Sequence, residues 1–485
     1  SITSGGNYNT VVGDEAGTAL TTGDNNVAIG FEALKTEDTT GDNVAVGYQS
    51  LKTLNAGSDA FNTAVGYQAG LSVTTGIQTT LIGGAAGDAL TSGDANTAVG
   101  YIALSADTLG SHSVAVGRNA LKVQNFTTAT DVYNVAVGSN AGAAITTGTR
   151  NTFIGGLAGD ASTDADKNVA VGTDALGGNT VGSRSVAVGD SALFAQNPAT
   201  ATDMYNTAVG HGAGSAVTTG TSNVLIGGLT GDSLQTGGQN VAMGVGAIGS
   251  DTQGQTAVAI GHNALSSQNF TTSTSHYNVA VGHTAGGSVT TGVLNTLVGG
   301  LAGDALTTGN NNTAVGYQAL SADTLGDRNV ALGVQALAAQ NFTTSTDSYN
   351  TAVGFTAGAS ITTGANNTLI GALAGDALTD STQNTVVGYG ALSADTKGRF
   401  SVAVGYLALQ DQNFTTTTNT YNVAVGHGAA KNITTGVQNV IIGGLAGDAL
   451  TDADSNVAVG ISALTSDTLG SRSVAIGAGA LFTQN

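Results

Sequence analysis

The sequence predicts an all-β fold, a parallel β-solenoid, on three observations. The phrase NTAVG of residues 62–66, or a close variant, occurs 27 times from Gly13 to Gly477, and every copy keeps its glycine. Successive glycines are 17, 17 and 19 residues apart, and then follow a repeating pattern of 17, 17, 17 and 21. The 3.6-residue apolar period of helices is absent. A short period nested in a longer one, here of 72 residues, is typical of solenoids.

Each copy of the phrase opens one turn of the solenoid, or rung, whose position one is the Asn. Positions two and four carry β-branched or aliphatic residues, as in Thr63 and Val65, so they share one face of a short strand. The glycine at position five predicts a sharp corner. Position eight is Ala in 25 of the 27 rungs, which predicts a crowded contact in a second short strand. A turn such as residues 74–76 completes the rung.

Position one is Asn in 21 rungs. Stacked one rung apart, these amides can hydrogen-bond along the solenoid as a ladder. The alternative is that each Asn serves its own rung as a turn former.

Position three lies on the face opposite to positions two and four. It is Ala in most rungs and bulky in one rung of four, although water would cover that face of an isolated solenoid. Strands that are apolar on both faces are buried on both faces. We therefore expect a homo-oligomer, most simply a parallel trimer. Its predicted oligomer seam consists of Leu81, Phe153, Leu225, Leu297, Leu369 and Ile441.

The four rungs of a 72-residue repeat place their large apolar side chain differently. Two have Gly at position nine and an aliphatic residue at position twelve, as in Gly70 and Val73. The other two have Leu at nine and a polar residue at twelve, as in Leu104 and Asp107. One large apolar side chain per rung is the pattern expected of a filled core.

Composition narrows the class of protein. The chain has 74 Gly, one Pro, no Cys, and 5% aromatic residues, which suits a thin solenoid interior better than a globular core. Its net charge of −20 argues against nucleic acid and anionic membranes as partners. It has no apolar run long enough for a spanning helix and no signal peptide, so an export signal would have been removed or would lie outside this sequence. We expect an extracellular, cell-surface or virion location.

The repeats predict one continuous rod in three sections. Residues 1–61 form an irregular first repeat, residues 62–421 hold five 72-residue repeats, and residues 422–485 form an incomplete sixth. The final rung lacks eight residues ending in Tyr, and residues 1–8 also end in Tyr. Two interpretations follow: molecules stack head to tail, or the segment belongs to a longer protein with further domains.

The phrases NTAVGYQAG, NVAVGYQSL, NTAVGYQAL and RSVAIGAGAL resemble the head repeats of trimeric autotransporter adhesins of the YadA type. They are also similar to the shaft repeats of bacteriophage tail fibres. The resemblance covers nearly all rungs. It implies a left-handed parallel β-roll that forms a trimer and acts in attachment and as a rigid spacer.

The 21-residue rungs contain a four-residue extension with recurring aromatic residues. Aromatic side chains on protruding loops could contact a glycan or protein on a cell surface. Alternatively, they cover the flank of the solenoid or pack on a neighbouring chain. The candidate binding residues are Phe126, Tyr133, Tyr205, Phe270, Tyr277, Phe342, Tyr349, Phe414 and Tyr421.

Aspartates recur once per repeat, and oxygen-rich acidic arrays can bind Ca²⁺ when several carboxylates converge. Asp as a turn residue explains the pattern equally well, so no cofactor is expected beyond this possible calcium site. The candidate ligands are Asp88, Asp160, Asp232, Asp304, Asp376 and Asp448.

His211, His283 and His427 follow the rung glycine and could form three-histidine rings in a trimer, or be solvated. No Ser/His/Asp set or paired carboxylates can be argued, so nothing indicates an enzyme. The sequence favours the structural shaft of an extracellular fibre, of adhesin or tail-fibre type, that acts as a rigid spacer. The alternatives are a self-assembling head-to-tail filament subunit and, more weakly, an ice-binding protein with Thr arrays.

Overall fold

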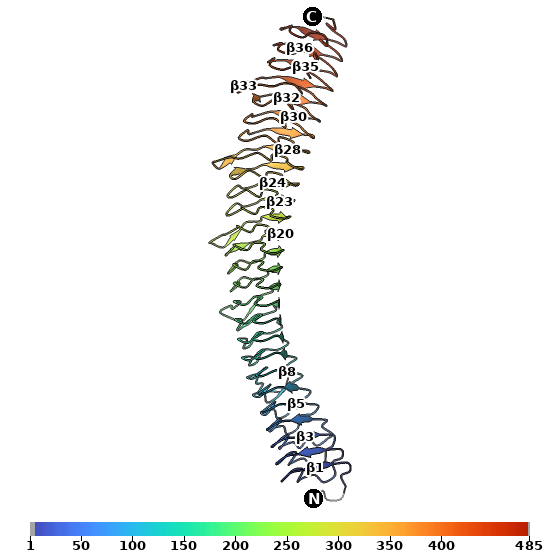
Figure 1. Cartoon of the computed structure of the whole chain (residues 1–485), viewed down its shortest axis with the longest axis vertical. Helices are drawn as coiled ribbons and strands as arrows, with labels where there is room; N and C mark the ends of the chain where they lie inside the picture. The colour runs from blue at the N-terminus through green and yellow to red at the C-terminus, as the bar shows by residue number, and fades with distance from the viewer. Residues whose placement is uncertain (1–4, 484–485) are drawn as a thin grey trace. The chain divides into compact units, whose positions relative to one another are not determined.

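The computed structural model describes residues 5–483 of the chain. It folds as two compact halves, Ser1–Asn240 and Val241–Asn485, and each half is a parallel β-solenoid. Every rung contributes one three-residue strand that covers positions two to four of the repeat phrase. Figure 1 labels some of these strands. The all-β solenoid predicted from the glycine spacing is confirmed.

In the N-terminal half, adjacent rungs pair in parallel and in register, so Thr63 is opposite Thr80 and Ala64 is opposite Leu81. Its three-residue strands are β1 (Thr10–Val12), β2 (Val27–Ile29), β3 (Val44–Val46), β4 (Thr63–Val65), β5 (Thr80–Ile82), β6 (Thr97–Val99), β8 (Val114–Val116), β10 (Val135–Val137), β11 (Thr152–Ile154), β12 (Val169–Val171), β14 (Val186–Val188), β16 (Thr207–Val209) and β17 (Val224–Ile226).

The C-terminal half repeats the same pairing, with Val330 opposite Thr351 across a 21-residue rung. Its three-residue strands are β18 (Val241–Met243), β20 (Val258–Ile260), β22 (Val279–Val281), β23 (Thr296–Val298), β24 (Thr313–Val315), β26 (Val330–Leu332), β28 (Thr351–Val353), β29 (Thr368–Ile370), β30 (Thr385–Val387), β32 (Val402–Val404), β34 (Val423–Val425), β35 (Val440–Ile442), β36 (Val457–Val459) and β37 (Val474–Ile476).

The two faces of these strands are assigned the opposite way from the prediction. Position three points into the solenoid, where Ala64 and Leu81 are fully buried. Positions two and four point outward, and Val65 and Ile82 keep 36% and 38% of their surface exposed. The predicted oligomer seam is therefore wrong, because all six bulky residues lie inside their own chain: Leu81, Phe153, Leu225, Leu297, Leu369 and Ile441.

The bulky residue at position three fills space left by two glycines. A Cβ atom added to Gly70 would lie 2.8 Å from Leu81 Cδ1, and one added to Gly87 would lie 2.8 Å from Leu81 Cδ2. Phe153 fills the same space between Gly142 and Gly159. One large side chain in every four rungs is thus a core-packing requirement of the two glycine rungs. The predicted alternation of core side chains is confirmed, since Val73, Leu90, Leu104 and Leu121 are all buried.

The predicted second strand around position eight is absent from the described residues, which form turns there. Positions seven and nine adopt positive φ, as in Gln68 (56°) and Leu104 (53°), and this breaks an extended chain. The Ala at position eight is nevertheless buried, as predicted. The corner glycine is required because a Cβ on Gly66 would lie 2.4 Å from the Gly83 carbonyl oxygen.

The asparagine ladder is confirmed and runs through the interior beside position three. Asn62 Oδ1 accepts a hydrogen bond from the backbone N–H of Thr79 in the next rung, at 2.9 Å. Asn62 Nδ2 donates to the carbonyl of Gly76 in the turn of its own rung, at 2.8 Å. The Asn62 amide therefore joins two rungs and closes its own turn, which combines the two roles that the sequence left open.

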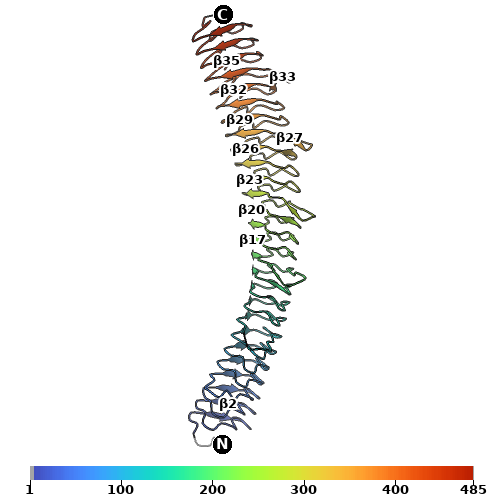
Figure 2. The ribbon, with the colours of Figure 1, turned by 180° about the vertical axis from the view of Figure 1, so that it is seen from behind.

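The extensions of the 21-residue rungs form small two-stranded parallel sheets with the rung before. Figure 2 shows β27 and β33 projecting from the side opposite to β26, β29 and β32. The pairs are β7 (Gly110–Ser111) with β9 (Thr130–Asp131), β13 (Gly182–Ser183) with β15 (Thr202–Asp203), β19 (Gly254–Gln255) with β21 (Thr274–Ser275), β25 (Gly326–Asp327) with β27 (Thr346–Asp347), and β31 (Gly398–Arg399) with β33 (Thr418–Asn419).

Candidate functional site

The outward face of the three-residue strands is an apolar surface that recurs along each half. Val or Thr at position two and Val, Ile, Leu or Met at position four recur on every rung in strict register, as in Val135 opposite Thr152 and Val137 opposite Ile154. These side chains are only half buried. We call this surface the outer face. An extended apolar surface on a soluble protein is typical of an interaction site.

Aromatic side chains at position six form short stacks along successive rungs. Phe31, Tyr48 and Tyr67 stack on three successive rungs, with ring centroids 5.4 and 5.2 Å apart. Tyr389 and Tyr406 stack in the same way, 5.6 Å apart. Their planes are nearly parallel, because identical positions on successive rungs keep the same orientation. Stacking covers the ring faces and leaves the ring edges in contact with solvent.

The three histidines that the sequence analysis considered for histidine rings also lie at position six. Each one stacks on another position-six ring or lies beside a carboxylate. His283 stacks on His262 at 5.2 Å and His427 on Tyr406 at 5.1 Å. His211 Nε2 lies 3.6 Å from Asp190 Oδ1, and both side chains are mostly exposed. Within one chain these histidines are surface side chains with local partners.

A buried polar network anchors each extension to the rung before it. Asp107 Oδ1 accepts the backbone N–H groups of Gly110 and Phe126, both at 3.1 Å. Asp107 Oδ2 accepts Gln124 Nε2 at 2.6 Å, and Gln124 Oε1 accepts Asn134 Nδ2 at 2.9 Å. The network recurs at Asp251–Gln268–Phe270–Asn278, Asp323–Gln340–Phe342–Asn350 and Asp395–Gln412–Phe414–Asn422.

The aspartates of this network are fully buried. Burial raises the pKa of Asp107, Asp323 and Asp395, although the hydrogen bonds from Gln and the backbone offset part of this effect. The repeated carboxylate is therefore a structural acceptor for the extension. It makes no contact with solvent through which it could bind a ligand.

One extension departs from this pattern at two residues together. Asn179 replaces the aspartate, and Pro198, which has no backbone N–H, replaces the phenylalanine. Asn179 Oδ1 accepts Gly182 N at 3.0 Å and Gln196 Nε2 at 3.4 Å, and its Nδ2 donates to Gly182 O at 2.7 Å. With one donor fewer to satisfy, a single side-chain oxygen is sufficient.

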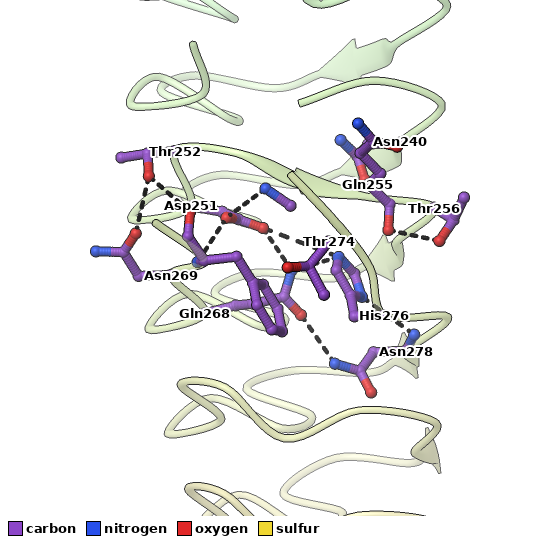
Figure 3. Close-up of polar contacts among 12 residues, drawn as sticks. Asn240, Asp251, Thr252, Gln255, Thr256, Gln268, Asn269, Thr274, His276 and Asn278 are labelled. Carbon is purple, nitrogen blue, oxygen red and sulfur yellow. Dashed lines mark hydrogen bonds and ion pairs between the residues drawn. The ribbon is translucent and has the colours of Figure 1, made fainter. Parts of the chain in front are cut away.

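A second extension contains a buried histidine (Figure 3). The His276 ring is fully buried and stacks on Phe270 with centroids 4.9 Å apart. Its Nδ1 lies 3.2 Å from the backbone N of Asn278 and its Nε2 lies 2.9 Å from Gln268 Nε2. The Asp251 carboxylate lies 3.9 Å from Nε2. Burial lowers the pKa of His276 to about 4, and the charge of Asp251 opposes that shift.

The structure separates the two kinds of aromatic residue that the sequence placed together as candidate binding residues. The four phenylalanines, Phe126, Phe270, Phe342 and Phe414, are more than 90% buried. They pack under the extension, as the alternative interpretation held. The five tyrosines are about half exposed on the extension flank: Tyr133, Tyr205, Tyr277, Tyr349 and Tyr421.

Four of the five half-exposed tyrosines contact a side chain of the preceding rung through one ring face. Tyr133 stacks on His112 at 5.1 Å and Tyr421 on Phe400 at 5.2 Å. The guanidinium groups of Arg184 and Arg328 lie over Tyr205 and Tyr349, at 5.6 and 5.5 Å from the ring centroids. One ring face of each of these four tyrosines is therefore occupied within the chain.

The structure does not bring the candidate calcium ligands together. They recur on every fourth rung, and residues 5–483 contain no group of three or more acidic or His side chains placed to hold a metal. Burial raises the pKa of Asp88, Asp160, Asp232, Asp304 and Asp376. In the sixth member, Asp448 Oδ1 accepts the Thr465 hydroxyl.

Sequence reasoning missed the outer face and the Asp–Gln–Asn network. Position two is Val in some rungs and Thr in others. This pattern could have indicated the outer face, because Thr is tolerated where water has access. The Gln at position twelve of every described 21-residue rung, for example Gln124 and Gln196, was a signal for the network.

The geometry defines the class: the chain is a repeat protein with a parallel β-solenoid fold. No protein-family model and no curated protein matches its sequence. Within the described residues, no helix is long and apolar enough to cross a membrane.

Proposed function

We propose that the chain forms the shaft of an extracellular fibre, in which parallel copies of the chain cover each other's outer faces. The observation that carries the proposal is the outer face itself, because it presents half-exposed apolar side chains on every rung of both halves. Covering apolar surface stabilises association by about 25 cal/mol per Å².

The period of the outer face favours a second copy of the chain as its partner. Strands of one rung follow those of the next at roughly 4.8 Å. A partner with any other spacing would lose register after a few rungs, whereas an identical parallel chain matches every rung. The resemblance to YadA-type head repeats implies three copies. The corrected interface consists of positions two and four, in place of position three.

A covered outer face leaves the extensions accessible. In the C-terminal half, β27 and β33 project away from the side that carries β26, β29 and β32 (Figure 2). The exposed tyrosines of the extensions would then line the outside of the fibre, where they can contact glycans or proteins of a cell surface. The shaft acts mechanically, as a rigid spacer for attachment.

Substitution on the outer face tests the proposal. Val99→Asp with Val116→Asp places two charges on adjacent rungs of the outer face. We expect the Kd of the assembly to rise at least tenfold, because burying unpaired charges is costly. Thr127→Asp with Thr128→Asp adds the same charge to the exposed extension and should leave the assembly intact. Sedimentation equilibrium gives the mass of each variant.

A wild-type chain that remains a monomer at all concentrations would overturn the proposal. A mass of three chains supports the trimeric shaft, whereas masses that grow continuously with concentration support the end-to-end filament. The genes flanking the reading frame separate the two kinds of shaft, since virion genes indicate a tail fibre and a membrane anchor in the same frame indicates an adhesin.

A further inference from the structure

We propose that His276 makes one extension, residues 269–277, an acid-labile element that opens in mildly acidic solution while the rungs around it stay folded. The proposal rests on the hydrogen-bond geometry around the imidazole ring (Figure 3). It is independent of the proposed fibre function, because it concerns the interior of a single chain.

The amide groups next to the ring have only one workable orientation. Asn278 Oδ1 accepts the backbone N–H of Asn295 at 3.0 Å, and its Nδ2 donates to Gly292 O at 2.7 Å. Nδ2 also lies 3.0 Å from Gln268 Oε1, so this atom of Gln268 must be the acceptor. Gln268 Nε2 is therefore turned toward Asp251 Oδ2, at 2.6 Å, and toward the ring.

Both nitrogens of the His276 ring consequently face N–H donors. Nδ1 faces the backbone N–H of Asn278 and Nε2 faces the amide of Gln268. A neutral imidazole has one acceptor nitrogen, so one of the two contacts is unsatisfied at neutral pH. A protonated imidazole has none, so protonation removes the remaining bond and places a cation in a buried site.

Few charges surround the ring. The Asp251 carboxylate, on the preceding rung, is the charged group that faces it, at 3.9 Å from Nε2. The neighbours on its own rung, Gln268 and Phe270, are neutral. The backbone groups that hydrogen-bond to the His276 backbone are also neutral: the carbonyl of Gln255 on one side and the N–H of Leu294 on the other.

The other described extensions carry no ionisable group at this place: the equivalents of His276 are Val132, Met204, Ser348 and Thr420. His276 compensates for Ala257, which has a methyl group where Asn329 supplies an amide oxygen. Asn329 Oδ1 accepts the N–H of Asn350 at 3.3 Å, and His276 Nδ1 accepts the corresponding N–H of Asn278. Protonation thus removes the acceptor of the Asn278 N–H.

The sign of the effect follows from the two protonation states. The pKa of His276 is about 4 in the closed extension, and the ordinary value of 6.5 applies once it opens. The stability contributed by the neutral ring is complete above pH 6.5 and is lost as the pH falls toward 4. Between pH 7 and 4.5, protonation shifts the equilibrium toward the open extension by roughly 60-fold.

Hydrogen exchange measured by mass spectrometry on the full chain tests the proposal. After correction for intrinsic exchange rates, protection of residues 269–277 should fall by roughly 60-fold from pH 7 to 4.5. The extensions with Val132, Ser348 and Thr420 should lose none. In His276→Ser and His276→Thr, which introduce the residues found at Ser348 and Thr420, the loss should disappear.

Two results would overturn the proposal. One is an equal loss of protection in the wild type and in both variants, which would mean that His276 is not the group that titrates. The other is a loss of protection in all rungs together, which would mean that acid unfolds the solenoid as a whole. A loss confined to residues 269–277 in the wild type, and absent from the Thr variant, supports it.

Discussion

Asn179 and Pro198 compensate each other across two adjacent rungs. Proline removes a backbone N–H that a buried aspartate accepts in the equivalent extensions, and asparagine supplies one acceptor oxygen where the aspartate supplies two. The NH2 group of Asn179, which aspartate lacks, donates a hydrogen bond to the carbonyl oxygen of Gly182. The two differences are therefore one change in hydrogen bonding, made in two places.

This relationship predicts a coupling between Asp323 and Phe342. Asp323→Asn alone leaves an N–H donor of its network unpaired, and Phe342→Pro alone leaves the aspartate with one donor fewer. The double variant should be more stable than the sum of the single effects by about 1 kcal/mol or more. Native-state hydrogen exchange gives the free energy of local opening of residues 340–350 in the wild type, the two single variants and the double variant. These four values form the double-mutant cycle that measures the coupling. Additive effects would contradict the relationship.

Leu81→Ala should open a cavity between Gly70 and Gly87 and destabilise its rung by about 2 to 5 kcal/mol. Hydrogen exchange of residues 80–90 measures this loss, which should not depend on protein concentration. The neighbouring Ile82→Ala is the control, because this residue lies on the outer face. Its effect should be smaller and should grow weaker where the protein is monomeric. Equal effects of the two changes would contradict the assignment of the faces.

Gly155 and Gly156 are adjacent but differ in what a side chain would meet. A Cβ on Gly155 would lie 2.4 Å from the Gly172 carbonyl oxygen and φ is 139°, whereas a Cβ on Gly156 meets nothing within 4 Å. We expect Gly155→Ala to cost at least about 3 kcal/mol through strain and steric clash. Gly156→Ala should be nearly neutral. Limited proteolysis at increasing urea concentrations measures the local stability of this rung and distinguishes the two variants.

The extensions should respond to pH with different signs. Burial raises the pKa of Asp323 above its ordinary 3.8, so the folded state holds this proton more tightly than the unfolded state. The destabilisation caused by burying the ionised Asp323 carboxylate is absent below pH 3.8. It accumulates as the pH rises to the pKa of Asp323 in the folded state, and it is constant above that pKa. Protection of residues 340–350 should therefore increase from pH 7 to 4.

Residues 196–206, which depend on Asn179, provide the matched control for this measurement. Their protection should not change over the same range, because an amide does not titrate. A parallel rise in both segments would show that the effect comes from the net charge of −20 instead of the buried carboxyl.

Much of the fold could be predicted because a strict repeat reports the same structure many times. The glycine spacing predicted the rungs, and the recurring Asn predicted a ladder that the structure contains, as in Asn62 and Thr79. The alternation of Val73 with Leu104 predicted where each rung places a large core side chain, and both residues are buried. Each inference needed only a period and the size of a side chain.

The extension aromatics were harder to assign from sequence, because Phe126 and Tyr133 have the same spacing and similar hydrophobicity. The Asp107 carboxylate decides the difference: it accepts the N–H of Phe126 and holds this residue under the extension. Tyr133 lies beyond the small strand β9 and stacks on His112 at the surface. Pairing between rungs separates the two residues, and a single-rung pattern does not contain that information.

The sequence by itself determined that the chain is a β-solenoid and where each rung begins, since the period of Gly66 and its equivalents admits no other regular packing. Only the tertiary structure decided which strand face is the interior. Alternation shows that Ala64 and Val65 point to opposite sides, but both are apolar. The choice depends on the space above Gly70 and Gly87, into which Leu81 at position three projects. This contact joins two rungs, because Gly70 lies on one and Leu81 and Gly87 on the next, so it exists only once the rungs are stacked.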